Sequence, residues 1–121
     1  MAHRDLEHRT FQFACNVAEL CGYLSTRGSV TRQLSRQLLD AATSIGANYE
    51  EAIAAQTGRD FASKCAISLK EARETRYWLR LIATSDGTTQ PRVSPLVVEA
   101  GELVAIFGAM ERNARYRRDR N

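Results

Sequence analysis

Largely apolar side chains recur along this sequence in alternating steps of four and three residues, the spacing that places them on one face of an α-helix. The first such row is Leu6, Thr10, Phe13, Val17, Leu20 and Leu24. Three further rows follow the same spacing, and breaks that contain Gly28, Gly58 and Gly87 separate the four. The pattern predicts helices over residues 4–26, 30–56, 59–85 and 94–117, within one domain that covers residues 1–121.

The breaks between the predicted helices are short, and short connections join neighbouring antiparallel helices. Apolar rows of this spacing are typical of helices that pack nearly parallel or antiparallel to one another. Ser94 and Pro95 are suited to begin the fourth helix, as its N-cap and its first helical residue. We therefore expect an all-α protein that folds as an antiparallel up-down-up-down four-helix bundle.

The second and third predicted helices also suggest a register. If they form a hairpin about Gly58, Asn48 and Ser68 fall at one level inside the bundle. A buried amide without a partner costs on the order of 1–3 kcal/mol, so we expect these two side chains to pair. Glu51 is close to Asn48 in sequence and is expected to be partly buried beside a polar partner.

Each predicted helix carries a second row of apolar or small residues beside the first. A helix of a bundle needs one apolar face, so the second row indicates either a generous core or an interface between subunits. Trp78 and Tyr49 are large and lie off the first row, which favours the interface. The predicted interface residues are Leu39, Tyr49, Ile53, Trp78 and Leu81.

Composition adds a basic C-terminal end. The chain has 121 residues, 44% hydrophobic and 26% charged, as expected for one soluble globular domain. Its formal net charge is +3, but residues 112–121 hold five arginines and one aspartate, so the remaining residues sum to −1. These arginines are Arg112, Arg115, Arg117, Arg118 and Arg120. They are expected either to stabilise the C-terminus of the helix or to contact phosphates, with Tyr116 available for stacking.

The sequence contains no pattern that points to catalysis, a cofactor or a metal. Di-metal bundles need Glu-x-x-His pairs, and the only histidines, His3 and His8, both lie at the start of the first predicted helix. Cys15, Cys21 and Cys65 match no metal-binding spacing, and no glycine pattern matches a phosphate loop. We therefore expect a protein that is not an enzyme.

The N-terminal residues lack the apolar stretch of a signal peptide, and no run approaches the 18 apolar residues that indicate a membrane span. An odd number of cysteines is consistent with reduced thiols. These observations predict a cytoplasmic location and no membrane partner.

Two motifs in the second and third predicted helices carry a family resemblance. Residues 42–52 read ATSIGANYEEA, and residues 67–79 read ISLKEARETRYWL. The Ser-Ile-x-Ala-Asn-x-x-Glu and Glu-x-x-Tyr-Trp-Leu patterns in these segments resemble the 23S ribosomal RNA intervening-sequence proteins, also called four-helix bundle proteins. The resemblance covers residues 34–82.

The resemblance implies an antiparallel four-helix bundle that assembles into a homopentamer, in a family whose molecular role is not established. A related group, the accessory variability proteins of diversity-generating retroelements, resembles a basic pentameric barrel that binds nucleic acid and a reverse transcriptase. Asn48, Glu51 and Glu74 belong to the matching motifs. Together with Ser68 they are expected to form a structural polar network rather than a catalytic set.

The third predicted helix mixes Glu71 and Glu74 with Lys70, Arg73 and Arg76, so a solvated, ion-paired face is its simplest interpretation. Family members often have a glutamate where Arg76 stands. This helix is therefore more basic than usual, which favours an anionic partner.

The leading hypothesis is a non-enzymatic homopentamer that binds RNA or DNA backbones through the arginines of residues 112–121, without base readout. The alternative hypothesis is a protein-binding adaptor or scaffold, whose pentameric surface docks a partner such as a reverse transcriptase.

Overall fold

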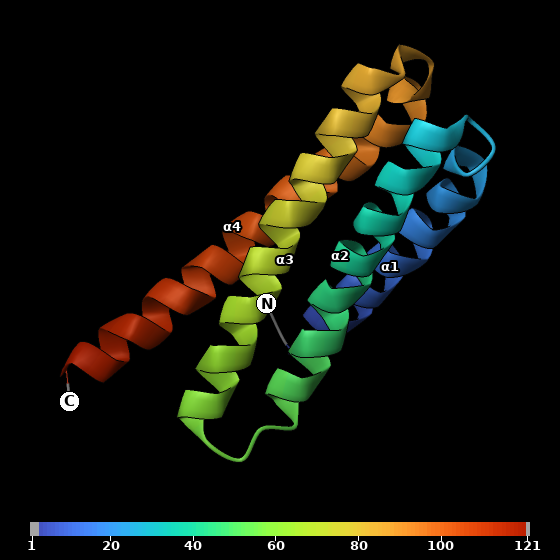
Figure 1. The fold of residues 1–121 in the computed structure, drawn as a ribbon. Coiled ribbons are helices and arrows are strands. Elements are labelled where there is room, and N and C mark those ends of the chain that lie inside the picture. Colours follow the sequence, from blue (N-terminus) through green and yellow to red (C-terminus); the bar gives the residue numbers. More distant parts are fainter. Residues whose placement is uncertain (1–2, 121) are drawn as a thin grey trace.

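The computed structural model describes the backbone of residues 3–120 and the side chains of residues 4–117. Its long helices are α1 (His3–Leu24), α2 (Ser29–Ile53), α3 (Gly58–Ser85) and α4 (Gln90–Arg120), and a short 3-10 turn, η1 (Gly87–Thr89), precedes α4. The chain reverses at each connection, so that successive helices lie side by side (Figure 1). Within the described residues there is no strand, and the expected all-helical, four-helix architecture is confirmed.

The start of α4 differs from the prediction, because the helix begins before Ser94, which is therefore not its N-cap. The carboxylate of Asp86 accepts hydrogen bonds from the backbone N–H and the hydroxyl of Thr88, at 3.2 and 2.6 Å. This turn leads directly into α4, and Pro91 occupies the first helical turn, where backbone N–H groups have no helical partner. Pro95 lies inside the helix and removes one backbone hydrogen bond without ending it.

The predicted apolar rows form the core. The six residues of the first row, on α1, are each at most 6% exposed. The rows of the other three helices contribute fully buried side chains such as Ile45, Leu79 and Leu103. Tyr49 and Phe107 join α2 to α4 through an edge-to-face contact, with ring centroids 5.5 Å apart and an interplanar angle of 72°.

Much of the second apolar row packs against a neighbouring helix of the same chain. Gly46 lies so close to α1 that a Cβ atom there would stand 3.1 Å from Thr10 Oγ1, and a Cβ on Gly108 of α4 would stand 4.0 Å from Leu69 of α3. A helix inside a bundle contacts two neighbours and so needs an apolar arc wider than one row. Tyr49, fully buried, is therefore a core residue, and its predicted place in a subunit interface is wrong.

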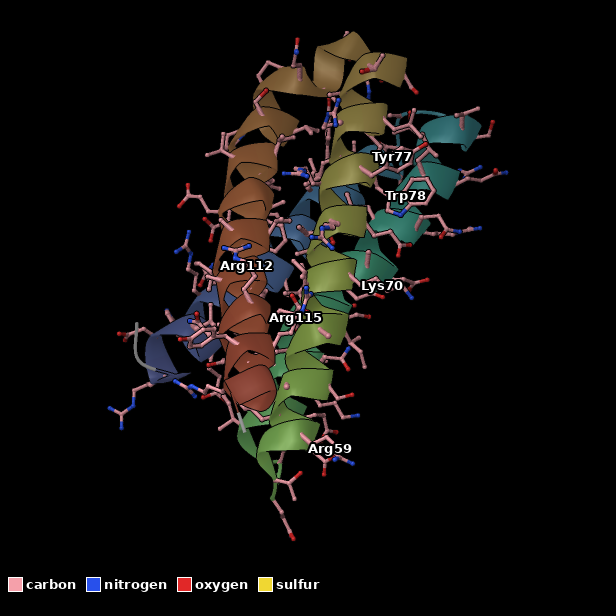
Figure 2. The ribbon with its side chains drawn as sticks, turned by 90° about the vertical axis from the view of Figure 1, so that its left-hand side faces the viewer. Arg59, Lys70, Tyr77, Trp78, Arg112 and Arg115 are labelled. Carbon is pink, nitrogen blue, oxygen red and sulfur yellow. The ribbon has the colours of Figure 1, made fainter. Side chains whose placement is uncertain are left out.

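The helices do not enclose the core evenly. The α3 helix packs closely against α2 and α4, and α1 packs against α2, but contacts between α1 and α4 are sparse. Figure 2 shows α3 and α4 side by side. Three N–H···O bonds of 2.7 Å bridge the open side, two from Arg9 of α1 to Glu99 of α4 and one from Arg9 to Glu102. These charged hydrogen bonds raise the pKa of the Arg9 guanidinium further above its usual range.

Arg9→Ala should lower the free energy of unfolding by about 1–2 kcal/mol, because it leaves two neighbouring carboxylates without their cation. Urea denaturation at low and high salt measures this, and the loss should shrink at high salt. The control is Arg4→Ala, which removes an exposed cation that makes no ion pair with any described residue and should cost less than about 0.5 kcal/mol. Equal losses in the two variants would contradict the bridging role of Arg9.

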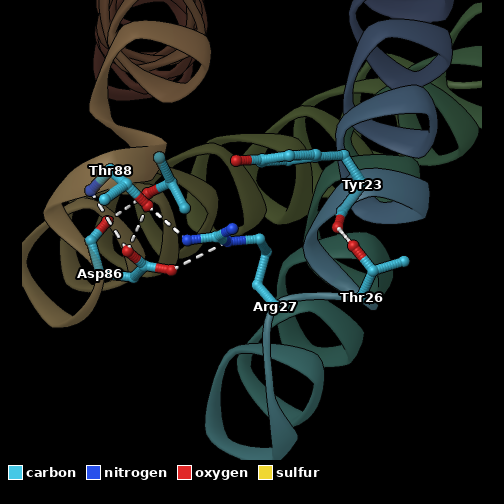
Figure 3. Close-up of polar contacts among 6 residues, drawn as sticks. Tyr23, Thr26, Arg27, Asp86 and Thr88 are labelled. Atoms are coloured by element: carbon cyan, nitrogen blue, oxygen red, sulfur yellow. Dashed lines mark hydrogen bonds and ion pairs between the residues drawn. The ribbon is translucent and has the colours of Figure 1, made fainter.

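At one end of the bundle, polar contacts join the connection between α1 and α2 to the connection between α3 and α4 (Figure 3). Arg27, after α1, donates to Asp86 Oδ2 at 3.2 Å and to Thr88 Oγ1 at 2.6 Å. Hydrogen bonds from Thr88 and Arg27 hold the pKa of Asp86 below its usual range. The guanidinium of Arg92 lies 4.0 Å from the centroid of the Tyr23 ring, a cation–π contact that joins α4 to α1.

Gly22→Ala should raise the free energy of unfolding by about 0.5–1 kcal/mol, because glycine is a poor residue inside a helix. No heavy atom lies within 4 Å of the position that a Cβ would take there. The matched variant is Gly28→Ala, which should destabilise the fold because Gly28 has a φ of 117°, in the left-handed region. Thermal unfolding should therefore give midpoints that shift in opposite directions, and a lower midpoint for Gly22→Ala would contradict the packing at α1.

The α4 helix is also long and apolar enough to cross a membrane, since an 18-residue window has a mean hydropathy of 1.6. About a third of that window is buried within the bundle. The helix contributes Val93, Ala100, Leu103 and Phe107 to the core. A core helix and a membrane span share this length and hydropathy. The absence of a membrane partner therefore stays a prediction.

Candidate nucleic-acid interface

One exposed row of α3 carries cations around a tyrosine. Arg59, Lys70 and Tyr77 are separated by 11 and 7 residues, which places them within about 20° of each other around the helix. Arg73 and Arg80 flank Tyr77 at spacings of four and three residues, the distances at which helical side chains are neighbours. All five side chains are exposed. Figure 2 shows the three labelled members of the row, Arg59, Lys70 and Tyr77, along one side of α3.

Of the two glutamates in the middle of α3, Glu71 lies on a different side of the helix from Tyr77, whereas Glu74 lies three residues before Tyr77 and so borders the row. Ser68 faces α2, because its hydroxyl donates to the backbone carbonyl of Ile45 at 2.8 Å. Glu71 follows one helical turn later and is half-buried, as is Glu74. Burial, and then the charge of Glu74, raise the pKa of Glu71 above its usual range. No ion pair between these carboxylates and Lys70 or an arginine of α3 occurs among the described residues, so the predicted ion-paired face is wrong.

The α4 helix adds two cations on the side that faces α3. Gly108 packs near Leu69, and Arg112 one turn later points the same way, with its Nη1 atom 3.4 Å from the position of a Gly108 Cβ. Arg115 is exposed and forms an ion pair of 2.5 Å with Glu111. Figure 2 shows Arg112 and Arg115 on α4, the helix that lies beside α3.

These cations make up one surface, which we call the basic face: Arg59, Lys70, Arg73, Arg80, Arg112 and Arg115. Arg59 and Arg80 are 21 residues apart on one helix, so the face is about 31 Å long. Two carboxylates border the face, Glu74 beside Lys70 on α3 and Glu111 in its ion pair with Arg115 on α4. An elongated cationic surface of this kind can bind a chain of phosphates.

The basic face combines predicted and unpredicted residues. Arg112 and Arg115 were expected to bind nucleic acid, and Arg117 is also exposed, whereas the side chains of Arg118 and Arg120 lie outside those that the structure describes. The four cations of α3 were not predicted as a site. The signal in the sequence was spacing, because Lys70 and Arg73 precede Tyr77 by seven and four residues and Arg80 follows it by three, which indicates a shared helix face.

The predicted polar network does not form. Asn48 donates from Nδ2 to the carbonyl of Ser44 at 2.9 Å, while Ser68 donates to Ile45. Glu51 is exposed and Glu74 is half-buried. No hydrogen bond joins Asn48, Glu51, Ser68 and Glu74 to each other within the described part of the chain. The predicted pairing of Asn48 with Ser68 is wrong, because Asn48 bonds to a carbonyl of its own helix and Ser68 bonds across to a carbonyl of α2.

Family comparisons agree with this architecture. The 23S rRNA-intervening sequence protein family matches residues 5–109. The chain belongs to this family. A similar solved structure is the crystal structure of a protein with unknown function from the S23 ribosomal protein family of Bacteroides thetaiotaomicron VPI-5482, with 32% sequence identity and a TM-score of 0.78. The similarity covers 87% of this chain and 96% of that chain, and no curated protein matches.

The match to the intervening-sequence protein family covers the α3 part of the basic face but not its α4 part. The match includes all of α3 but ends before Arg112 and Arg115. The cations of α3 therefore lie within the part of the chain that matches the family, and those of α4 lie after the matched residues. The relation to retroelement accessory proteins stays a prediction.

The remaining residues of the predicted interface lie at the surface to different degrees. Leu39 and Trp78 are half-buried and pack against the core. Ile53 is 38% exposed and Leu81 is half-buried. The indole N–H of Trp78 is buried without a hydrogen-bond partner in the described structure. An interface at these four residues stays a prediction.

The three cysteines of the intervening-sequence protein occupy two kinds of environment. Cys15 is exposed, whereas Cys21 and Cys65 are buried. Burial raises the pKa of the Cys21 thiol and that of the Cys65 thiol from 9.0 to about 11. Among the described residues, no group of three or more histidine, cysteine or acidic side chains is placed to hold a metal ion.

At mildly alkaline pH, a thiol reagent should modify Cys15 rapidly and leave Cys21 and Cys65 unmodified until the protein unfolds. Absorbance of the released chromophore measures this, and Cys15→Ser should remove the rapid phase. Since the folded pKa of each buried thiol exceeds the unfolded value, the stability that these thiols contribute is complete below about pH 9 and lost as the pH rises toward about 11. Rapid modification of two or three thiols in the native protein would contradict this packing.

Proposed function

We propose that this intervening-sequence protein binds RNA, and does so by contacting phosphates through the basic face rather than by catalysing a reaction. The observation that carries the proposal is the row of exposed cations along the outer side of α3, with the half-buried Glu71 outside the row and Glu74 at its edge. Arginine and lysine bind phosphate oxygens without reading base sequence, so the expected binding is strong at low salt and sequence-independent. We expect it to take place in the cytoplasm.

The test is the salt dependence of RNA binding by the full chain, followed by fluorescence anisotropy of a labelled RNA. Arg73→Gln with Lys70→Gln removes two cations of the basic face, and Arg32→Gln with Arg36→Gln removes two exposed cations from α2. Both variants lose the same net charge. The first should flatten the slope of log affinity against log salt by about 0.7 for each single-strand phosphate that is no longer neutralised. Equal effects of the two variants would contradict a specific face.

We further propose that the subunit, an antiparallel bundle, assembles into a homopentamer, as the family resemblance implies. Exposed apolar side chains such as Phe11 and Val98, 58% and 62% exposed, support association. Light scattering after gel filtration should give five times the subunit mass of 13.5 kDa. A single species of 13.5 kDa would exclude the assembly.

A second candidate function is the docking of a protein partner such as a reverse transcriptase. It is favoured by the open side between α1 and α4, where a shallow pocket of about 400 Å³ is lined by residues that include Gln12, Phe13, Pro95 and Leu96. An adaptor of this kind would not bind RNA at low salt. Absence of RNA binding in the titration above would therefore favour docking over the first proposal.

A further inference from the structure

Tyr77 lies on the basic face near the end that Arg80 marks, although phosphate binding by cations does not require an aromatic ring. Its side chain is 57% exposed. The ring makes an edge-to-face contact with Trp78, with centroids 5.2 Å apart and an interplanar angle of 77°. Trp78 in turn packs against the core. This contact holds the Tyr77 ring in place while leaving much of its surface open to solvent.

The cations nearest to Tyr77 bracket it along the helix. Arg73 precedes it by four residues and Arg80 follows it by three, so that both are its neighbours on the surface of α3. Their α-carbons are about 10 Å apart along the axis. Neither arginine forms an ion pair within the described part of the chain. The arrangement is an aromatic ring between two cations that make no ion pair with a described residue, and the half-buried Glu74 lies three residues before the ring.

An aromatic ring flanked by cations suits a nucleotide whose base is unpaired. Bases of a single strand stack on aromatic side chains while the flanking phosphates bind arginine or lysine. The bases of a duplex are stacked within the helix, so they cannot stack on a protein ring and leave only the phosphates to contact. Tyr77 therefore distinguishes the two forms of nucleic acid.

We propose that the basic face selects single-stranded nucleic acid, with a base stacked on Tyr77 and the adjoining phosphates bound by Arg73 and Arg80. This inference rests on the proposed RNA-binding function and adds the class of ligand to it. It does not involve Tyr116, which is 63% exposed near the end of α4 and provides a second aromatic ring for comparison.

Trp78 provides a direct signal for this contact. It is the single tryptophan of the chain, and its ring touches that of Tyr77. Titration of the full chain with an oligouridine of about 15 nucleotides should therefore change Trp78 emission. A duplex RNA of equal length should bind without this change.

The variants are Tyr77→Ala, Tyr77→Phe and the matched control Tyr116→Ala, each followed by anisotropy with labelled oligouridine and with the duplex. Tyr77→Ala should weaken oligouridine binding by about five- to 100-fold and leave duplex binding unchanged, since stacking on one base accounts for that range. Tyr77→Phe should keep wild-type affinity, because it keeps the ring. Circular dichroism checks that each variant is folded.

The outcomes separate this inference from the function on which it rests. If Tyr77→Ala weakens single-strand and duplex binding equally, or weakens neither, while Lys70→Gln with Arg73→Gln weakens both, the basic face binds phosphates without stacking and the inference fails alone. If Tyr116→Ala has the larger effect on oligouridine, the stacking residue is on α4 and the inference also fails. If the wild-type protein binds neither nucleic acid at low salt, both proposals fail.

Discussion

Reversing the charge of three residues of the basic face, with Lys70→Glu, Arg73→Glu and Arg112→Glu, should lower the affinity for RNA by on the order of 100-fold or more. Each substitution removes a phosphate contact and adds repulsion of a phosphate. The residues are exposed, so the fold should be retained. Binding at low salt, measured by anisotropy together with circular dichroism, checks the expectation.

Removal of residues 117–121 provides the comparison for this triple variant. It deletes three arginines and one aspartate but leaves the basic face intact. We expect a smaller loss of affinity than in the triple variant, because all six cations of the basic face remain. If the truncation instead abolishes binding and the triple variant keeps it, phosphate contact belongs to the C-terminal arginines alone.

Tyr49→Ala should lower the free energy of unfolding by about 3–5 kcal/mol, the cost of truncating a large buried aromatic side chain. Tyr49 is fully buried and its ring contacts that of Phe107, so the substitution opens a cavity where α2 meets α4. Urea denaturation measures the loss. Small domains have only about 5–15 kcal/mol of stability in total, so the variant should be close to unfolding at physiological temperature.

Tyr77→Ala is the matched control for Tyr49→Ala, because it truncates the same residue type at an exposed position. We expect it to cost less than about 0.5 kcal/mol. An interface role for Tyr49 would give another pattern, in which the oligomer dissociates while the subunit keeps its unfolding free energy. That result would place Tyr49 outside the core.

The helices and the core were predictable because both depend on local spacing. A row such as Leu6, Phe13 and Val17 shares one side of any α-helix, and the apolar side is the one that is buried. The start of α4 was not predictable from Ser94 and Pro95. Their cap pattern was outweighed by the turn that Asp86 builds ahead of it.

The candidate site was predictable only in part. The arginines of residues 112–121 stood out by their number, whereas Lys70 and Arg73 were hidden among carboxylates adjacent in sequence. Adjacent residues on a helix point about 100° apart, so neighbours in sequence need not be neighbours in space. The hydroxyl of Ser68, bound to α2, shows which side of α3 is turned inward and so which charges remain outside.

The sequence by itself determined the number of helices, their inner rows and the family. These follow from a period of 3.6 residues and from motifs that need no knowledge of neighbouring helices. Only the tertiary structure decided that Tyr49 lies in the core, that Asn48 and Ser68 bond to helix carbonyls, and that α3 and α4 share a basic face. The physical reason is that helical periodicity sets the angles between side chains on one helix. Packing against neighbouring helices decides which of those side chains face the protein and which face water.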